Sequence, residues 1–430
     1  MKIVIVNKSD STGGAAVVSF RLMEALRSVG VDARMIVAEK LTDSPHVALA
    51  APAWRLKTSF LADRLPVAFA NGFDRSTLFK LDAASAGIEI SRHPWVRDAD
   101  AIFLNWINQG MLSLSDIRRI CDLGKPVVWT MHDMWNLTGL CHHAGECGRY
   151  RIPGHCGDCP LLGRHASAQD LSKRVSLRKS RLYAGRGIRF VAVSSWLAGK
   201  AAESTLLHGE SVSVIPNAFR LPDCRELCRT AGKPGELRLI FGAARLDDDV
   251  KDFPTFVESL RCLKSGWPGL ADRVRVILYG GIRDASLIDG IPFPVEYTGM
   301  LHDPAEIVAL YSRSDIVIST SRFETLPGTL VEGQAYGCLP VTFGNGGQRD
   351  IIDHGETGLI VDRTADVAAN ARAMAAAIAR GAKMLQQDAD AIRRRMYTSV
   401  RDRFSAEAVA RAYLRLLRED VRVSTPYQIF

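Results

Sequence analysis

Apolar residues along this chain alternate between short continuous runs and longer stretches in which they recur every three or four positions. The run 2–6 is typical of a buried strand, the stretch 14–29 has the period of an amphipathic helix, and 31–37 returns as a strand. Further strand-like runs follow at 101–106, 126–131, 189–193 and 212–215. Strands that alternate with helices predict a parallel sheet covered by helices on its faces.

The same alternation starts again after residues 216–236, where three prolines and two glycines interrupt the pattern and predict a linker. The second series of runs lies at 237–242, 274–279, 295–298, 315–319, 339–343 and 359–361, and helical stretches follow at 364–380 and 404–418. We therefore predict an α/β protein of two Rossmann-like, doubly wound parallel-sheet domains that face a central cleft. The domains would be 1–215 and 237–403, with 404–430 as a closing helix and tail.

Length and composition narrow the classes of protein. At 430 residues the chain far exceeds a typical domain of roughly 100–150 residues. Its 47% hydrophobic and 24% charged residues exclude a collagen, an extended disordered chain and a membrane bundle. The apolar run 3–6 is too short for a signal peptide, and no run approaches the roughly 18 residues that span a bilayer. We therefore expect a cytoplasmic protein.

Positive charge is concentrated in one region of the chain. Residues 151–200 carry ten Lys and Arg against two Asp, which equals the net charge of +8 of the whole chain. A local patch favours an anionic surface such as phosphate or lipid head groups over nucleic acid. Six cations lie close together in the basic segment 164–189: Lys173, Arg174, Arg178, Lys179, Arg181 and Arg186. They predict either a solvated helix face or a peripheral contact with an anionic membrane.

Four of the nine cysteines, Cys141, Cys147, Cys156 and Cys159, fall within nineteen positions of a Gly-rich loop spanning 139–163. Four thiolates can close a tetrahedral zinc site, which would be structural because no position stays open for water. The alternatives are free thiols, a redox pair, or two disulfides, which a reducing compartment disfavours.

A glycine pair follows the first strand. Gly13 and Gly14 stand between strand 2–6 and helix 14–29, where backbone N–H groups can approach a phosphate or a sugar. A tight turn that needs positive φ explains the same residues. The segment is neither G-x-G-x-x-G nor a Walker A loop, which disfavours a dehydrogenase or a nucleotidase.

The segment 321–337 is the most informative part of the chain. Glu324 follows strand 315–319, Pro327 suits the first turn of a helix, and Glu332 would lie inside that helix. A carboxylate beside unpaired helix N–H groups can bind a sugar hydroxyl and a diphosphate side by side. Arg245 ends strand 237–244, and Lys251 follows three aspartates, so both cations would either face the cleft or pair with those aspartates.

His132 ends the buried strand 126–131 and is predicted to face the cleft. A structural histidine is the alternative. Trp106 and Trp135 occupy similar positions in the pattern and either stack on a sugar ring or form core beside the cleft.

These residues, with the downstream segments 346–352 and 355–359, resemble the retaining GT-B-fold glycosyltransferases of glycosyltransferase family 4. The resemblance covers nearly the whole chain and implies transfer of a sugar from a nucleotide-diphosphate sugar to a glycan acceptor, with retention and without a catalytic metal. Arg245 and Lys251 would hold the diphosphate, and Glu332 the ribose. The remaining contacts to the donor sugar and phosphates would come from Glu324, Pro327, Gly328, Thr329 and, in the other domain, His132.

The resemblance is to the members that assemble surface polysaccharides, whose acceptors are commonly linked to a lipid diphosphate. We therefore expect a glycan or lipid-linked oligosaccharide as acceptor, no nucleic-acid partner, and a peripheral position at the inner face of the membrane. Leu326-Pro327 replaces the Phe-Gly of many relatives, which leaves the donor sugar open. Two other functions remain: a nucleotide-sugar epimerase on the same fold, and a non-catalytic sugar-binding protein.

Overall fold

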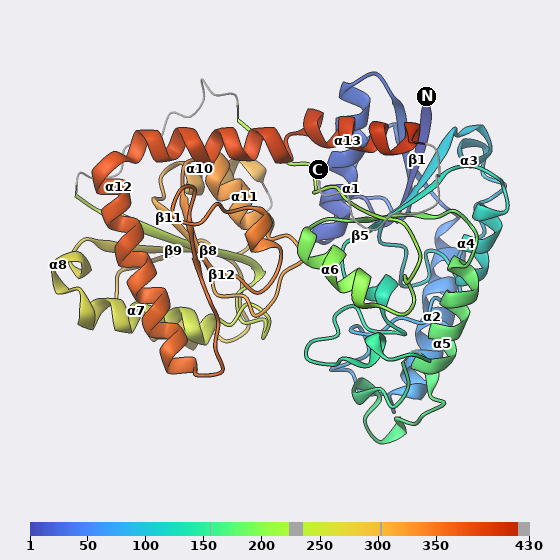
Figure 1. Ribbon diagram of the computed structural model, residues 1–430, viewed down its shortest axis with the longest axis horizontal. Helices are drawn as coiled ribbons and strands as arrows, with labels where there is room; N and C mark the ends of the chain where they lie inside the picture. The colour runs from blue at the N-terminus through green and yellow to red at the C-terminus, as the bar shows by residue number, and fades with distance from the viewer. Residues whose placement is uncertain (155, 223–234, 302, 420–430) are drawn as a thin grey trace. The chain divides into compact units, whose positions relative to one another are not determined.

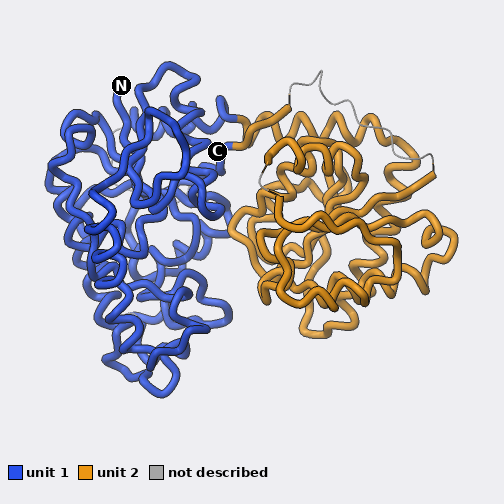
Figure 2. Tube along the Cα trace, turned by 180° about the vertical axis from the view of Figure 1, so that it is seen from behind, with its two compact units in different colours: residues 1–218, 406–430 blue, residues 219–405 orange. Residues whose placement is uncertain are grey.

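The computed structural model describes residues 1–154, 156–222, 235–301 and 303–419. The described chain folds into two compact units (Figures 1 and 2). Unit 1 contains residues 1–218 together with the last helix, which begins at Ala406, and unit 2 contains Phe219–Ser405. Among the described residues no helix is long and apolar enough to cross a membrane.

Unit 1 is built on a parallel sheet of seven strands in the order β3-β2-β1-β4-β5-β6-β7. Its strands are β1 (Lys2–Ser9), β2 (Asp32–Glu39), β3 (Val47–Leu49), β4 (Ala101–Leu104), β5 (Val127–Met131), β6 (Arg189–Ala192) and β7 (Val212–Val214). The central strands consist almost entirely of buried apolar residues, as expected of a parallel sheet covered on both faces. Every strand-like run predicted in this half corresponds to one of these strands.

The sheet of unit 1 is covered by α1 (Gly14–Ser28), α2 (Ala53–Ala70), α3 (Pro94–Asp98), α4 (Leu114–Cys121), α5 (Leu171–Tyr183), α6 (Ser195–Glu203) and α13 (Ala406–Arg418). The last of these comes from the far end of the chain. Tyr413 of α13 packs against Phe103 with ring centroids 5.3 Å apart, and its hydroxyl lies 2.9 Å from Thr130 Oγ1. The closing helix therefore completes the core of the N-terminal unit.

Unit 2 has a parallel sheet of six strands in the order β10-β9-β8-β11-β12-β13. The strands are β8 (Leu237–Arg245), β9 (Val274–Gly281), β10 (Val295–Tyr297), β11 (Ile316–Ser319), β12 (Leu339–Phe343) and β13 (Leu359–Val361). The helices are α7 (Phe253–Gly266), α8 (Pro268–Ala271), α9 (Ser286–Asp289), α10 (Pro304–Ser312), α11 (Gly328–Ala335) and α12 (Val367–Phe404), the last bent at Asp388. Helices α7 and α12 bury their apolar faces on the sheet.

The predicted fold class is confirmed, because both units are doubly wound parallel sheets with helices on their faces. The boundary between the units lies between Ala218 and Phe219, inside the segment predicted as a linker. Residues 223–234 of that segment lie outside the described chain. Helix α2 and strand β3 have no counterpart among the sequence predictions.

Candidate functional site

The carboxyl ends of β8 and β11, neighbouring strands of unit 2, carry the strongest group of predicted residues. Arg245 is the last residue of β8, and Lys251 lies in the loop that leads to α7. Glu324 lies in the loop between β11 and α11. Two hydrogen bonds join these loops: Arg322 N donates to Val250 O at 2.8 Å, and Thr320 Oγ1 donates to Lys251 O at 2.9 Å. Residues far apart in the sequence therefore meet at one edge of the sheet.

Lys251 and Glu324 form an ion pair between these two loops. The Lys251 ammonium donates to Glu324 Oε1, which also accepts a hydrogen bond from Ser321 Oγ at 3.0 Å. The two side chains are 29% and 19% exposed, so they are partly desolvated and still accessible to a ligand. The alternative in which Lys251 pairs with the preceding aspartates is wrong for this residue.

Arg245 does pair with those aspartates. Its Nη2 lies 3.1 Å from Asp248 Oδ2, and its Nε lies 3.4 Å from Asp247 Oδ1. The side chain is 40% exposed and stands at the end of the strand, so an anionic ligand could compete with the aspartates for it.

Helix α11 begins directly after Pro327, which is the N-cap residue and provides no side-chain cap. Gly328 and Thr329 form the first turn, where the backbone N–H groups of a helix have no acceptor within the helix. Glu332 lies inside α11, as predicted. A Cβ on Gly333 would lie only 2.6 Å from Val317 Cγ1, so glycine there lets α11 pack closely on β11.

Glu332 is electrostatically coupled to the pair Tyr279 and Tyr311, whose hydroxyl oxygens lie 2.6 Å apart. Burial raises the pKa of both tyrosines, and the negative charge of Glu332 raises it further. Both phenols are therefore neutral at physiological pH. The side chain of Glu332 is therefore close enough to the buried Tyr279 and Tyr311 for its charge to act on both.

A third loop, which follows β12, supports the backbone of Glu324. Gly347 N donates to Glu324 O at 2.9 Å, and a Cβ on Gly346 would lie 2.2 Å from the same carbonyl oxygen. Residues 344–350 follow β12, the next strand of the sheet. The close approach requires glycine at 346 and fixes the backbone that presents Glu324.

In unit 1, the glycine pair lies at the carboxyl end of β1. Gly13 is the N-cap residue of α1 and has φ of 89°, while Gly14 is the first residue of the helix. Gly13 therefore meets the conformational demand of a tight turn. A Cβ on either glycine would meet no atom within 4 Å, so the space beside this helix start is open. Packing does not explain Gly14.

The carboxyl ends of β4 and β5 bring together Trp106, His132 and Asp133. Trp106 is partly exposed, and its indole Nε1 donates to Asp133 Oδ2 at 2.9 Å. The same carboxylate oxygen lies 2.8 Å from His142 Nδ1, and the Trp106 and His142 rings stack with centroids 5.3 Å apart. Asn7 Oδ1 accepts from Trp106 N at 2.8 Å. Asp133, His142 and Asn7 were not singled out from the sequence, although Asp133 and Asn7 follow strand ends.

Burial and neighbouring charges together set the pKa values of His132 and Asp133. Desolvation lowers the pKa of His132 to about 4, although the charge of Asp133 acts in the opposite direction, so the ring is neutral at pH 7. Burial alone would raise the pKa of Asp133, but the charge and hydrogen bond of His142 hold it below its ordinary range. A neutral imidazole at the end of β5 can donate a hydrogen bond to a sugar hydroxyl or accept one from it.

The structure decides two sequence interpretations in unit 1. Trp135 is 1% exposed and donates from Nε1 to Asp82 O at 2.8 Å, so the core alternative is confirmed for this residue. The interpretation of Lys179 as a surface cation is wrong. Lys179 is fully buried on the inner side of α5, where its ammonium donates to Trp135 O at 2.6 Å and to Thr138 O at 3.0 Å. It cannot belong to a docking surface. Arg174, Arg178 and Arg181 remain exposed on that helix.

None of the four cysteines of the Gly-rich loop forms a disulfide in the structure. Cys156 Sγ accepts a hydrogen bond from Gly139 N at 3.2 Å, and burial raises the pKa of Cys141 to about 12 and that of Cys159 to about 11. In the described part of the chain, no group of three or more His, Cys, Asp or Glu side chains is arranged to hold a metal ion. The zinc site therefore stays a prediction without geometric support.

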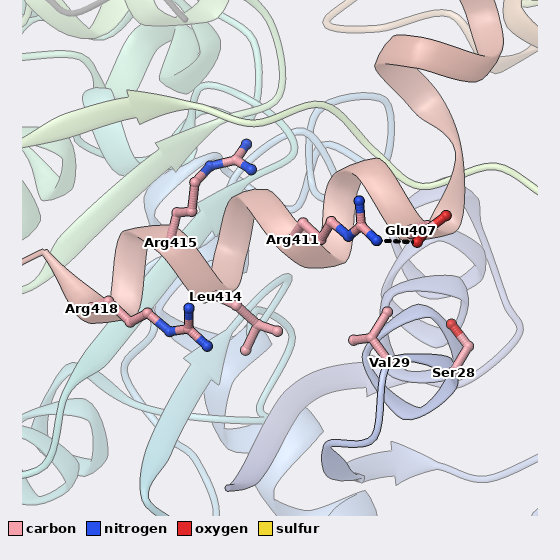
Figure 3. Close-up of a pocket in the computed structure, with 7 residues that line it drawn as sticks. All are labelled: Ser28, Val29, Glu407, Arg411, Leu414, Arg415 and Arg418. Carbon is pink, nitrogen blue, oxygen red and sulfur yellow. Dashed lines mark hydrogen bonds and ion pairs between the residues drawn. The ribbon is translucent and has the colours of Figure 1, made fainter.

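A surface pocket of about 680 Å³ lies elsewhere on unit 1, between the end of α1 and helix α13 (Figure 3). Glu407 and Arg411 form an ion pair on its wall, and Arg415 and Arg418 extend from the same helix. It contains none of the residues predicted from the sequence.

Two known protein families match this chain, one over each half. Residues 12–221 match the family described as Glycosyltransferase Family 4, and residues 238–380 match that described as Glycosyl transferases group 1. The two matches cover most of both units. The chain belongs to glycosyltransferase family 4.

One curated relative of this family 4 protein is WcaC of Escherichia coli (strain K12), which is named as a colanic acid biosynthesis glycosyl transferase. The two are 22% identical over 261 residues, which cover 56% of this chain. The match spans 59% of the relative.

Solved structures share the fold over nearly the full length. A glycosyltransferase from Rickettsia africae has a TM-score of 0.61 at 16% identity and covers 97% of this chain and 98% of its own. Anabaena HepE, solved in complex with UDP and glucose, has a TM-score of 0.55 at 15% identity and covers 97% and 99%. A trehalose-phosphate synthase from Burkholderia xenovorans has a TM-score of 0.62 at 12% identity and covers 97% and 100%. The family 4 protein therefore has the GT-B fold.

Proposed function

We propose that this protein is a glycosyltransferase that moves a sugar from a nucleotide-diphosphate sugar to a hydroxyl group of a glycan acceptor in surface polysaccharide biosynthesis. The observation that carries the proposal is the group at the carboxyl ends of β8 and β11. There Arg245 ends β8, and Lys251 and Glu324 stand in loops joined by hydrogen bonds. The loop of Glu324 leads directly into the first turn of α11. Two cations and a helix N-terminus suit a diphosphate, and a carboxylate suits a sugar hydroxyl.

In this proposal unit 2 holds the donor. Arg245, Lys251 and the N–H groups of Gly328 and Thr329 bind the diphosphate, and Glu332 binds the ribose. Glu324 accepts hydrogen bonds from sugar hydroxyls once the diphosphate draws Lys251 toward itself. HepE has been solved in complex with UDP and with UDP-glucose, so UDP-glucose is the first donor to test.

Unit 1 would bind the acceptor around Gly13, Gly14 and Trp106, and His132 keeps the donor-sugar role that the resemblance implies. The acceptor hydroxyl attacks the anomeric carbon on the face from which the diphosphate leaves, so the carbon–oxygen bond to phosphate breaks as the new glycosidic bond forms. The proton of the hydroxyl passes to the leaving diphosphate, and configuration is retained. The developing phosphate charge is stabilised by Arg245, Lys251 and the α11 N-terminus without a catalytic metal.

The acceptor in this proposal is linked to a lipid, and the protein reaches it from the cytoplasm as a peripheral protein at the inner face of the membrane. The basis is the name of WcaC and the exposed arginines of α5. Arg174, Arg178 and Arg181 make no ion pair within the described residues, so they are available to anionic head groups.

A two-stage experiment tests the function. A panel of nucleotide sugars is first screened by thermal shift, since a donor at 100 times its Kd stabilises the fold by about 2.7 kcal/mol. The stabilising donor is then incubated with lipid-linked oligosaccharides, and the anomeric configuration of the product is determined by NMR with and without EDTA. Transfer with retention in EDTA supports the proposal. Epimerised donor without acceptor would indicate an epimerase, and donor binding without turnover a sugar-binding protein.

A further inference from the structure

Helix α2 of unit 1 has an inverted distribution of polarity. Its charged pair Asp63 and Arg64 is buried, at 0% and 6% exposure. Arg64 donates to Asp63 Oδ2 at 2.6 Å, to Asp82 Oδ2, and to Leu81 O at 2.8 Å. This network satisfies the buried charges and anchors the inner side of the helix to the loop that precedes residue 85.

The outer side of the same helix is apolar. Trp54, Leu61, Leu65 and Phe69 are exposed by 67%, 60%, 51% and 65%. They stand seven, four and four residues apart, which places them on one face of a helix. Phe73 follows the helix, is 62% exposed, and meets the Phe69 ring with centroids 5.1 Å apart. We call these five residues the α2 face.

An ordinary surface helix shows the opposite arrangement, with its charged residues toward water. Single exposed apolar residues are common, but several large ones on one face of a helix mark an interaction site. No described residue of unit 1 covers the α2 face, since each of its side chains is more than half exposed.

The charges around the α2 face indicate the chemistry of the partner. The single acidic residue of α2, Asp63, is the buried one, so the exposed surface of the helix carries no carboxylate. Arg55 and Lys57 are exposed on either side of the apolar row and make no ion pair within the described chain. Beyond the helix, the exposed Asp74 carboxylate accepts hydrogen bonds from Ser76 N and Oγ, both at 2.9 Å. A positively flanked apolar face is complementary to an anionic lipid surface.

We infer that the α2 face docks on an anionic bilayer, with its aromatic and leucine side chains among the upper acyl chains and Arg55 and Lys57 at the phosphates. The inference deepens the peripheral membrane contact of the proposed function, and rests on it, by naming the surface that enters the lipid. The exposed arginines of α5 then add long-range attraction, which salt screens, whereas burial of the α2 face persists at high salt.

The test measures co-sedimentation of the full-length protein with vesicles of equal parts phosphatidylglycerol and phosphatidylcholine, without donor or acceptor. The main variant is Leu61→Ser/Leu65→Ser/Phe69→Ser. The matched control removes exposed apolar side chains from unit 2, Met300→Ser/Val367→Ser, and a second control removes charge from α5, Arg174→Gln/Arg178→Gln/Arg181→Gln. We expect the main variant to bind roughly tenfold more weakly or worse at high salt, and both controls to bind like the wild type there.

A second measurement does not depend on the triple variant. Brominated lipids should quench the Trp54 contribution to fluorescence, obtained as the difference between the wild type and Trp54→Phe. Quenching of that contribution in anionic vesicles supports insertion of α2, and its absence while the protein is bound overturns it.

The remaining outcomes distinguish the peripheral membrane contact itself from the claim that the α2 face makes it. If the wild type does not bind anionic vesicles at low salt, the peripheral contact itself fails and the α2 inference with it, whereas transfer to a soluble acceptor still tests the enzyme. If the wild type binds and only the α5 variant loses binding, the contact is real and the α2 inference is wrong. If sedimentation velocity without lipid shows a dimer that the main variant dissociates, the α2 face binds a second copy of the chain instead.

Discussion

Lys251 donates a hydrogen bond to Glu324 between the loops that follow β8 and β11. The residue predicted to bind phosphate and the residue predicted to bind the sugar therefore hold each other in place. The pair stabilises both side chains, because a partly buried cation and a partly buried carboxylate each need a partner. A donor that brings its own negative charge can take over Lys251 and leave Glu324 free to accept from a hydroxyl.

Replacement of either clamp cation should reduce transfer. Lys251→Ala and Arg245→Ala each remove one charge-assisted contact to the diphosphate, worth about 1.5–3 kcal/mol, so kcat/KM should fall at least about tenfold. Arg261→Ala, which breaks the exposed ion pair of α7 with Glu258, is the matched control and should leave kcat/KM unchanged. Near-normal turnover of both clamp variants would mean that the diphosphate binds elsewhere.

Glu324→Gln should separate sugar binding from nucleotide binding. The amide keeps the shape of the side chain and frees Lys251, so the affinity for the nucleoside diphosphate should stay the same or increase. Transfer should fall because the amide offers only one oxygen to the hydroxyls of the sugar. Titration calorimetry with the nucleoside diphosphate and turnover with the full donor give the two readouts. A loss of nucleotide affinity contradicts the assignment.

The buried Lys179 predicts a pH dependence of stability in unit 1. Burial lowers its pKa from 10.5 to about 7, although Asp82 acts in the opposite direction. Between these values the unfolded chain binds more protons than the folded one, so the free energy of unfolding contributed by this group rises with pH from about 7 to about 10. Lys179→Met should remove that rise, and the exposed neighbour Arg178→Met should keep it. Thermal unfolding at several pH values decides, and parallel curves for the wild type and Lys179→Met would refute the prediction.

The sequence predicted the two sheets because fully buried parallel strands are continuous apolar runs. It also located Arg245, Lys251, Glu324 and Glu332 because each follows or precedes such a run. The pairing of Lys251 with Glu324 was not predictable, since it depends on how two loops meet in space. Lys179 was misinterpreted for a related reason: within a run of cations, only the fold shows which one points inward. Helix α2 escaped notice because its apolar residues lie on both sides and give no clear helical period.

Metal analysis tests the cysteine loop. If Cys141, Cys147, Cys156 and Cys159 bind zinc, purified protein should contain about one zinc per chain, and Cys141→Ser/Cys156→Ser should lose it. Cys262→Ser, on α7 of unit 2, is the control and should retain the metal. Binding must displace protons from thiols whose pKa burial raises, so zinc release should increase as pH falls. Metal-free wild-type protein that is folded and active would reduce the group to ordinary thiols.

Trp106 should act as the platform for a sugar ring of the acceptor. Its indole is held on one side by the stacked ring of His142 and at its edge by Asp133, so the partly exposed ring is fixed without a ligand. A preorganised aromatic face costs little conformational entropy on binding, and its contact with a ring contributes about 0.5–1.5 kcal/mol beyond the buried area.

Trp106→Ala should therefore raise the KM for the acceptor by roughly three- to tenfold while leaving nucleotide affinity unchanged. Trp106→Phe keeps an aromatic face but loses the hydrogen bond to Asp133, so its effect should be intermediate. Trp95→Ala removes an aromatic side chain from α3, outside the proposed acceptor region, and serves as the control. The measurement is the acceptor dependence of transfer at saturating donor. A change in donor KM with an unaltered acceptor KM would place Trp106 outside the acceptor site, because only a residue that touches the acceptor can change its apparent affinity selectively.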